Sequence, residues 1–454
     1  MTPTTEAPRT FFQKLLDFVE RAGNKVPHPA VLFFILIALV VVFSQLFHML
    51  GASVAYQRIN PETHEIVDMR TGANSLLTAD GIRFVCTSMV PNFINFGPVG
   101  IILVAMIGVG LAERAGLIQA LIRRIVLIAP RRATTAIIVT LGVVSSIATD
   151  AKYLVLIPLG AAAFHGMGRH PLAGLAAALA AVAATFGVNV LVVPIDGILA
   201  EMTNDAIHIV DPNKSISLTS NFYFAIFSSL LLIVVCTLVT ERIVEPRMSK
   251  YVGDVPPEES QGLSPEELRG LRYALFAFAG MFALLLVMSL PPGAPLRHAE
   301  TGELLGNSPF MGSIIFMIMS LFLVTGVAYG IGAKTIASVE DGINAITKTF
   351  ADLGGLLFLF FVIAQFVAYF NYSNMGTIAA IKLANYLKEA DLGSIMLLMG
   401  FLLTGFVLSI PIPNIIPKWA IMAPIFVPVF MKLGVAPDVV LAAYRVSDAP
   451  PNVS

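Results

Sequence analysis

The sequence predicts an all-α polytopic membrane protein made of two inverted repeats, with eight or nine membrane spans and two re-entrant hairpins. Of its 454 residues, 57% are hydrophobic and only 13% are charged, whereas about a quarter of the residues in a typical soluble domain are charged. Mean hydropathy is +0.83. Apolar runs long enough to cross a bilayer as helices recur along the chain, for example at 31–50, 224–239, 274–290 and 314–332.

Charge and cysteine content exclude several other classes. The net charge of −1 offers no basic face to a nucleic acid,. Cys86 and Cys236 are far apart and lack the spacing of metal ligands, so we interpret them as structural,. Segment 1–30 is basic and amphipathic, without the short apolar core and small-residue cleavage site of a signal peptide,. The first span is therefore expected to direct its own insertion.

Lysine and arginine are distributed unevenly when the N-terminus is placed on the cytoplasmic side. Of the 28 basic residues, 17 fall in the resulting inside segments and 8 in the outside segments, while three lie at membrane depth. Excess positive charge marks the cytoplasmic side, so the sequence predicts a multi-pass protein with a cytoplasmic N-terminus. The inside segments are 1–30, 114–134, 165–171, 242–274 and 333–350, and the three basic residues at membrane depth are Lys152, Lys418 and Arg445.

This distribution requires two apolar stretches to enter and leave on the same side. The stretch 134–164 has arginines on the inside at both ends, and the stretch 394–430 has Lys388 and Lys432 on the outside. Straight spans would move Arg169 or Lys432 to the wrong side. We therefore predict two re-entrant hairpins that enter from opposite faces.

The two hairpins share the pattern K-[Y/W]-x4-P-x5-F, which begins at Lys152-Tyr153 and at Lys418-Trp419. Each hairpin is followed by an interrupted helix, the first over 172–208 and the second from residue 435. The pattern predicts a first half over 1–243, a cytoplasmic linker over 244–270 and a second half over 271–454.

Inverted repeats with hairpins and broken helices are typical of secondary transporters for ions and small molecules. Hydrocarbon offers no hydrogen bonds, so irregular backbone at membrane depth must be buried in protein or line a cavity. The prolines of SIPIPNIIPKWAIMAP (409–424) interrupt the helix,, which frees carbonyls for Na⁺ and N–H groups for an anionic substrate. The alternative is that these prolines only kink a span.

Charged and aromatic side chains at membrane depth are the first candidates for the site. The carboxylates of Asp150, Asp196 and Asp448 are costly there unless they are paired or functional,. Desolvation would suit them to carrying a proton, whereas bound Na⁺ would keep them ionised. Arg445 is placed either to pair with Asp448, three residues away on its helix, or to contact a substrate carboxylate.

Aromatic and neutral polar residues complete the predicted site. Trp419 and Tyr153 are candidates to stack on an aromatic substrate, although a lone tryptophan is also typical of the membrane interface. Neutral oxygens near the two breaks suit Na⁺ or polar substrate groups, although such residues also serve in helix packing. We expect ions at Ser145, Ser146, Thr149, Asp150, Asn189, Ser447 and Asp448, with Na⁺ at Asn189, Asp196 and Asn414.

Four segments along nearly the whole chain resemble the AbgT family, the p-aminobenzoyl-glutamate transporters. They are SSIATDAKYLVLIPLGAAAF, NVLVVPIDGILAEMTNDA, PNIIPKWAIMAPIFVPVF and AAYRVSDAPPN. The resemblance implies a homodimer of bowl-shaped subunits in the bacterial inner membrane, each with nine spanning helices and two hairpins. It also implies import of p-aminobenzoyl-glutamate or export of sulfonamide antimetabolites, driven by ion gradients with Na⁺ associated with the core.

The resemblance assigns functional roles to particular positions. They are Asp196, Trp419, Pro437, Arg445 and Asp448. The chain departs from the family at Pro411 and Pro413, where small or hydroxyl residues are usual. The family also continues beyond the second broken helix with a final span, whereas this chain stops at Ser454, so we expect either a truncated C-terminal end or a resemblance that fails there.

The leading hypothesis is a carrier, coupled to Na⁺ or H⁺, for p-aminobenzoyl-glutamate or sulfonamide-type drugs, with no cofactor. The substrate is expected to contact Trp419, Arg445, Asp448, Asp196, Asn414, Pro437 and Tyr153. The alternative is a Na⁺-coupled dicarboxylate carrier, because such carriers share paired hairpins and broken helices. A remote alternative is an intramembrane enzyme using Asp150 with Asp448, but the chain has neither H-E-x-x-H nor G-x-G-D, so we predict that it is not an enzyme.

Overall fold

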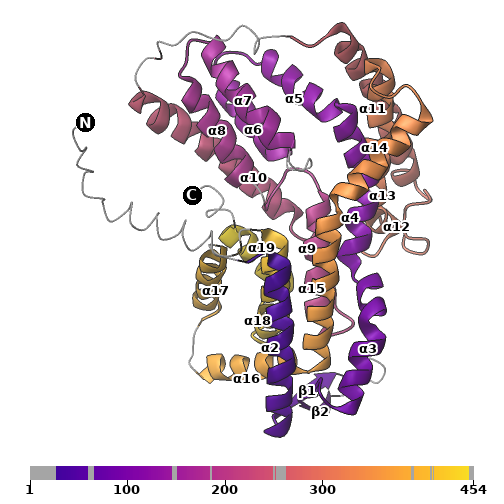
Figure 1. Ribbon diagram of the computed structural model, residues 1–454, viewed down its shortest axis with the longest axis vertical. Helices are drawn as coiled ribbons and strands as arrows, with labels where there is room; N and C mark the ends of the chain where they lie inside the picture. The colour runs from indigo at the N-terminus through magenta and orange to yellow at the C-terminus, as the bar shows by residue number, and fades with distance from the viewer. Residues whose placement is uncertain are drawn as a thin grey trace, which may run out of the picture.

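The computed structural model is mostly helical, as the composition predicts (Figure 1). It describes residues 27–59, 66–145, 151–184, 187–248, 251, 262–389, 393–409, 412 and 414–448. Within this part, seven segments are long and apolar enough to span a bilayer, by length and composition. They are α2 (Pro29–Met49), α3 (Ala79–Ile94) joined to α4 (Gly97–Ala115), α10 (Phe222–Val239) with the turns η2 (Thr240–Val244) and η3 (Glu245–Arg247), α11 (Pro265–Ser289), α13 (Ile314–Ala333), α15 (Gly354–Tyr372) and α18 (Ile415–Lys432). These segments confirm the predicted membrane class.

The remaining helices are shorter, and several are apolar arms of the two hairpins. They are α5 (Leu117–Leu127), α6 (Thr134–Val144), α7 (Ala151–Gly166), α8 (Pro171–Ala184), α9 (Pro194–His208), α12 (Pro309–Gly312), α14 (Val339–Asp352), α16 (Met375–Glu389), α17 (Ser394–Ser409) and α19 (Pro437–Asp448). The hairpin arms α6, α7 and α17 are too short to cross a bilayer singly, so each must be paired with the other arm of its hairpin,.

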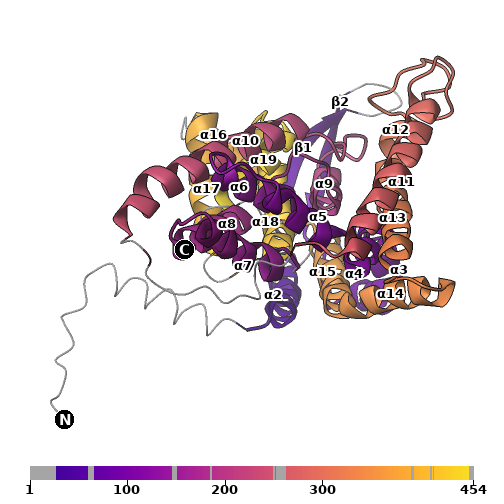
Figure 2. The ribbon, with the colours of Figure 1, turned by 90° about the horizontal axis from the view of Figure 1, so that it is seen from above.

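The long helices form a scaffold in which the same packing occurs twice. In one part α4 packs against α13 and α14, and in the other α15 packs against α2 and α3. The short helices α5 and α16 lie toward opposite ends of the long axis in Figure 1. Seen from above, the hairpins and α8, α10 and α19 gather on one side, while α11, α13 and α14 lie on the other (Figure 2). This repetition is what an inverted repeat requires.

Helices α4 and α13 approach closely because Gly108 has no side chain. A Cβ added at Gly108 would lie 2.0 Å from the Met319 carbonyl oxygen, whereas one at Gly100, also on α4, would meet nothing within 4 Å. Gly108→Ala should therefore separate the two helices and destabilise the protein by about 1–3 kcal/mol. The matched control Gly100→Ala should change stability by no more than about 1 kcal/mol. Thermal unfolding in detergent checks both, and equal Tm values would contradict this packing.

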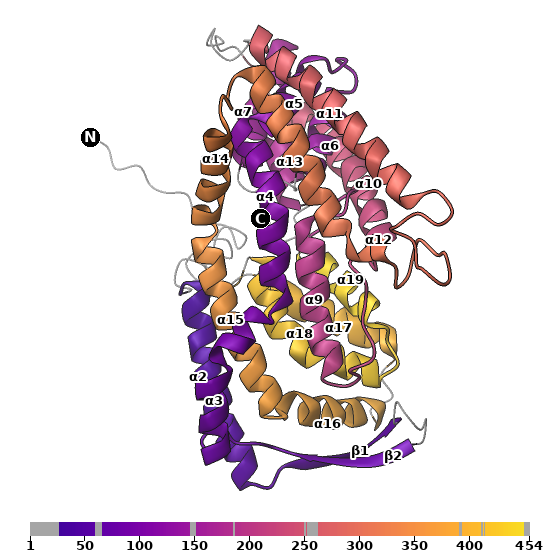
Figure 3. The ribbon, with the colours of Figure 1, turned by 90° about the vertical axis from the view of Figure 1, so that its right-hand side faces the viewer.

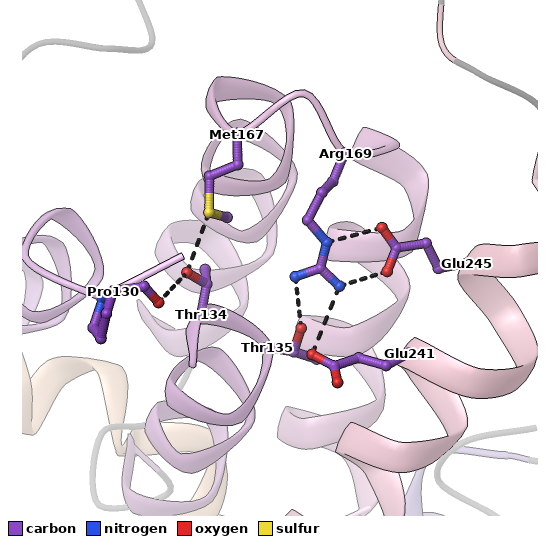
Figure 4. A network of polar contacts seen from close by, with 7 residues as sticks. All are labelled: Pro130, Thr134, Thr135, Met167, Arg169, Glu241 and Glu245. Carbon is purple, nitrogen blue, oxygen red and sulfur yellow. Dashed lines mark hydrogen bonds and ion pairs between the residues drawn. The ribbon is translucent and has the colours of Figure 1, made fainter. Parts of the chain in front are cut away.

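The first hairpin begins and ends at the same place, as Figure 4 shows. The Thr134 hydroxyl donates to the Met167 sulfur at 3.3 Å. Arg169 donates from Nη1 to the Thr135 hydroxyl at 2.9 Å. Residues at the start of α6 therefore contact residues just after α7, so the segment folds back on itself instead of crossing the membrane once.

The second hairpin is closed by aromatic packing between its arms. The ring of Phe401 on α17 lies 5.0 Å from the ring of Phe426 and 5.5 Å from the ring of Phe430, both on α18. Helix α16, which precedes this hairpin, lies at the lower end of the molecule in Figures 1 and 3, whereas α5, which precedes the first, lies toward the upper end. The two hairpins therefore open toward opposite ends of the molecule.

Arg169 joins the first hairpin to the end of the α10 segment (Figure 4). Its guanidinium donates from Nε to Glu245 at 2.8 Å, pairs with Glu241 at 3.8 Å and lies 3.9 Å above the Phe164 ring. The topology derived from basic residues places Arg169 and the segment after residue 242 on one side, and this contact requires the same arrangement.

Arg169→Gln is expected to destabilise the protein by about 1–3 kcal/mol, because two charge-assisted hydrogen bonds to Glu245 are lost. The exposed pair of Arg83 and Asp80 on α3 provides the control. Arg83→Gln should change stability by less than about 1 kcal/mol. The Tm of each variant is measured in detergent. An equal fall in Tm for the two variants would contradict the conclusion that Arg169 holds the first hairpin to the α10 segment.

Two features differ from the predicted organisation. Helix α11 begins at Pro265, inside the segment assigned to the linker, because Ser264 and Glu267 form a capping box there,. An antiparallel pair of strands, β1 (Ser53–Ile59) and β2 (Ile66–Gly72), lies in the long segment after α2. Val54 at its start packs with Ile378 and Ile381 of α16.

Candidate functional site

The breaks of the two repeats meet in the interior. Gly187, in the break between α8 and α9, lies so close to the second repeat that an added Cβ would be 3.4 Å from the Ile415 side chain and 3.7 Å from the Arg445 carbonyl oxygen. Ile415 begins α18 and Arg445 lies on α19. One hairpin tip and two interrupted helices therefore contribute to a single site.

Asp196 is positioned by the start of α9. Pro194 occupies the first turn, and Asp196 accepts the Val193 N–H through Oδ2 at 2.8 Å. This cap satisfies a backbone donor that the helix leaves free. It also orients Oδ1 toward Arg445, whose Nη1 donates to it at 2.7 Å.

Arg445 links the two repeats from a buried position on α19. Its Nη1 also donates to the Gly187 carbonyl at 2.7 Å, while Nε is buried and has no hydrogen-bond partner within the described part of the chain. The predicted alternative of an Arg445–Asp448 pair along α19 gives way to pairing across elements, because Asp196 and Lys418 reach these two side chains from α9 and α18.

Lys418 is a residue to which the sequence analysis assigned no role. Its ammonium donates to Asp448 and to the Ser409 hydroxyl, and the Lys418 and Asp448 side chains are both 0% exposed. The signal that could have identified it was its predicted position at membrane depth, where an ionised side chain requires a partner.

Trp419 is enclosed by polar and aromatic contacts. Its ring lies 4.4 Å from that of Tyr444 at an interplanar angle of 28°, and Nε1 donates to the Thr203 hydroxyl at 3.0 Å. The Tyr444 hydroxyl donates to the Ile415 carbonyl. Tyr444 was also missed, although it directly precedes Arg445 on the interrupted helix. The structure thus forms a stacked aromatic pair from α18 and α19, the helix that also carries the arginine.

Two predicted asparagines stabilise the breaks. Asn189 donates to the carbonyls of Val143 and Val144 at 3.2 and 3.3 Å, and its Oδ1 accepts the Leu191 N–H at 3.0 Å. It therefore ties the break of the first broken helix to the end of α6. Asn414 is the N-cap of α18, with Oδ1 accepting a backbone N–H at 3.0 Å.

The remaining predicted site residues lie in several places. The hydroxyls of Ser145 and Ser447 donate to carbonyls within their own turns, at 3.1 and 2.7 Å. Pro437 is buried at the start of α19. Tyr153 packs in the apolar cluster of the first hairpin, apart from the cluster that contains Trp419. Ser146, Thr149 and Asp150, with Pro411 and Pro413, lie outside the described residues.

Carboxylate, histidine and cysteine side chains offer no multidentate metal centre in the described ranges, where no group of three or more comes together. The side-chain oxygens of Asn189, Asp196 and Asn414 instead accept backbone N–H groups at the breaks. These contacts hold three irregular segments of the backbone in place.

A polytopic membrane protein with paired hairpins, two broken helices and charged groups where they meet has the architecture of a secondary transporter. The chain belongs to the AbgT putative transporter family, which it matches over residues 14–453. This result confirms the resemblance found in the sequence. Because the family consists of transporters, it also confirms that the protein is not an enzyme.

Curated and structural relatives agree with this assignment. The chain is 34% identical over 436 residues to the p-aminobenzoyl-glutamate transport protein of Escherichia coli strain K12, covering 96% of this chain and 84% of the relative. It is similar to the crystal structure of the Alcanivorax borkumensis YdaH transporter, with a TM-score of 0.83, 35% identity and coverage of 94% and 87%. It is also similar to Neisseria gonorrhoeae MtrF, from a class of antimetabolite efflux pumps, with a TM-score of 0.89, 39% identity and coverage of 96% and 87%.

Proposed function

We propose that this protein is an ion-coupled carrier of p-aminobenzoyl-glutamate and of sulfonamide-type antimetabolites in the bacterial inner membrane, with a cytoplasmic N-terminus. The relative from E. coli is named for transport of p-aminobenzoyl-glutamate, and the relative from N. gonorrhoeae belongs to a class of antimetabolite efflux pumps. A homodimer is part of the proposal, and cross-linking of the purified protein tests it.

The observation that carries this proposal is that α19 provides both the buried Arg445 and, at the preceding residue, Tyr444, whose ring stacks on Trp419. Arg445 is buried, and its Nε is a donor without a hydrogen-bond partner in the described part of the chain. A buried unpaired donor is costly, and a substrate carboxylate would satisfy it with a charge-assisted hydrogen bond. The substrate's aromatic ring would then lie near the two rings, where stacking is favourable.

Trp419 and Tyr444 are both 0% exposed in this conformation. A substrate ring therefore reaches either of them only after the hairpin tip or α19 moves. Such a movement is consistent with alternating access, in which the elements around a central site rock to expose it to each side in turn. Within this proposal Asp196, Asn414, Asp448, Pro437 and Tyr153 remain predicted substrate contacts.

The coupling ion is proposed to be H⁺ or Na⁺, bound near the two breaks. Carboxylates at membrane depth suit either ion. The predicted ion-binding residues remain Ser145, Ser146, Thr149, Asp150, Asn189, Ser447 and Asp448, and they provide hydroxyl, amide and carboxylate oxygens.

Flux into proteoliposomes tests the proposal. The full chain would be reconstituted and supplied with labelled p-aminobenzoyl-glutamate or a labelled sulfonamide under an imposed H⁺ or Na⁺ gradient. Flux that follows one gradient and collapses when an ionophore dissipates it would support the proposal and identify the ion. Flux of succinate or citrate without flux of either aromatic compound would contradict it and favour the dicarboxylate carrier.

A further inference from the structure

Lys418 extends from the start of one helix to the ends of two others. It lies in the first turns of α18, where the positive end of the helix dipole disfavours a cation,. Its ammonium instead contacts the hydroxyl of Ser409, the last residue of α17, and the carboxylate of Asp448, the last residue of α19. The long side chain thus places the ammonium away from the positive N-terminal end of α18 and beside the negative C-terminal ends of α17 and α19.

The end of α17 and the end of α19 together form a position suited to a cation. Helix C-termini carry partial negative charge and carbonyl groups that lack partners within the helix. A serine hydroxyl and an aspartate carboxylate add oxygen atoms. Carbonyl, hydroxyl and carboxylate oxygens are the ligands that hard cations prefer. The Tyr444 ring, whose centroid lies 5.7 Å from the Lys418 Nζ, adds a further favourable contact,.

Because this position is buried, an extra charge there that is not neutralised would be costly. The side chains of Lys418 and Asp448 are 0% exposed, and Arg445 and Asp196 balance each other separately. Among the described residues that pair here, a second cation at Asp448 would therefore lie next to the ammonium with both carboxylates already neutralised, in a region of low dielectric constant,.

We infer that Lys418 is a tethered cation that occupies the position at Asp448 where a free Na⁺ would otherwise bind. The inference therefore removes Asp448 from the set of residues predicted to bind Na⁺, and the second hairpin is held to α19 without an external ion. This inference deepens the proposed ion coupling and rests on that proposed function. If transport depends on Na⁺, the Na⁺ must then bind elsewhere in the site.

Removing the tether should convert this position into a Na⁺ site. The test measures the Tm of the purified full chain in detergent, in NaCl and in choline chloride at equal ionic strength. In Lys418→Ala, Na⁺ at about a hundredfold excess over its Kd should raise Tm by about 2–3 °C more than in the unaltered protein. The additional rise should disappear in Lys418→Ala/Asp448→Asn. The same Na⁺ response in the unaltered protein and in Lys418→Ala would overturn the inference.

A neutral pair keeps the test decisive if Lys418→Ala does not fold. Lys418→Met/Asp448→Asn replaces both charges with side chains of similar size, a change that buried ion pairs often tolerate. The inference expects this variant to bind as much labelled Na⁺ as the unaltered protein. Loss of Na⁺ binding in the neutral pair would overturn it, because Na⁺ would then have been bound at Asp448 beside the lysine.

The binding measurements do not depend on transport. If no substrate moves in proteoliposomes but Lys418→Ala gains a Na⁺ response, the proposed function fails and the tethered cation stands. If flux is found but the Na⁺ response is unchanged by Lys418→Ala, the proposed function stands and the tethered cation fails.

Discussion

Arg445→Gln is expected to reduce the flux of p-aminobenzoyl-glutamate by roughly 30- to 150-fold, the equivalent of about 2–3 kcal/mol for a charged hydrogen bond. The reason is that the buried guanidinium would no longer be present to bind the substrate carboxylate. The same change leaves the carboxylate of Asp196 buried without its cation, which should destabilise the protein by about 3–5 kcal/mol. Flux in proteoliposomes and Tm in detergent measure the two effects separately.

The double variant Asp196→Asn/Arg445→Gln separates folding from transport. It removes both charges of the pair, so most of the lost stability should return. Flux should stay low, because the donor for the substrate carboxylate is still missing. Recovery of flux together with stability would show that Arg445 acts only as the partner of Asp196, and it would contradict the proposed contact with substrate.

Trp419→Ala should destabilise the protein by about 3–5 kcal/mol, because a fully buried indole is replaced by a cavity,. Flux of the aromatic substrate should be lost as well, since the stacked pair with Tyr444 is removed,. Trp419→Phe keeps an aromatic face and should retain part of the flux. Tm and proteoliposome flux of the two variants check these expectations.

Thr203→Val provides the matched control for Trp419. It removes the acceptor of the Trp419 Nε1 hydrogen bond and keeps the ring and its stacking partner. The unpaired donor should cost about 1–3 kcal/mol, with a smaller loss of flux than in Trp419→Ala. If Thr203→Val and Trp419→Ala lost flux equally, the position of the indole, and not its face, would be what transport requires.

The class of protein was predictable because the features that indicate it, namely apolar runs, basic residues and prolines, lie within single segments of the chain. Spans follow from runs of apolar residues, and the re-entrant path of 134–164 follows from arginines at both of its ends,. The breaks follow from proline, which cannot continue a helix hydrogen-bond ladder. None of these signals depends on which helices are neighbours, so each can be read from a single segment.

The choice of partners could not be predicted in this way. Spacing along α19 suggested that Arg445 pairs with Asp448, but the two residues pair with Asp196 and Lys418, at sequence separations of 249 and 30. Tyr444 had no distinguishing pattern until the fold placed its ring against Trp419. Pairing of buried charges depends on distances between elements, because the interaction weakens with separation and is strong only where water is excluded.

By itself, the sequence determined that the chain is a membrane protein with paired hairpins and interrupted helices, since hydropathy, basic residues and prolines act within their own segments. Only the tertiary structure decided which charges neutralise each other, which ring covers Trp419 and which donor of Arg445 has no partner among the described residues. Those outcomes arise where two repeats meet, so they depend on atoms that are distant in the chain and adjacent only after folding.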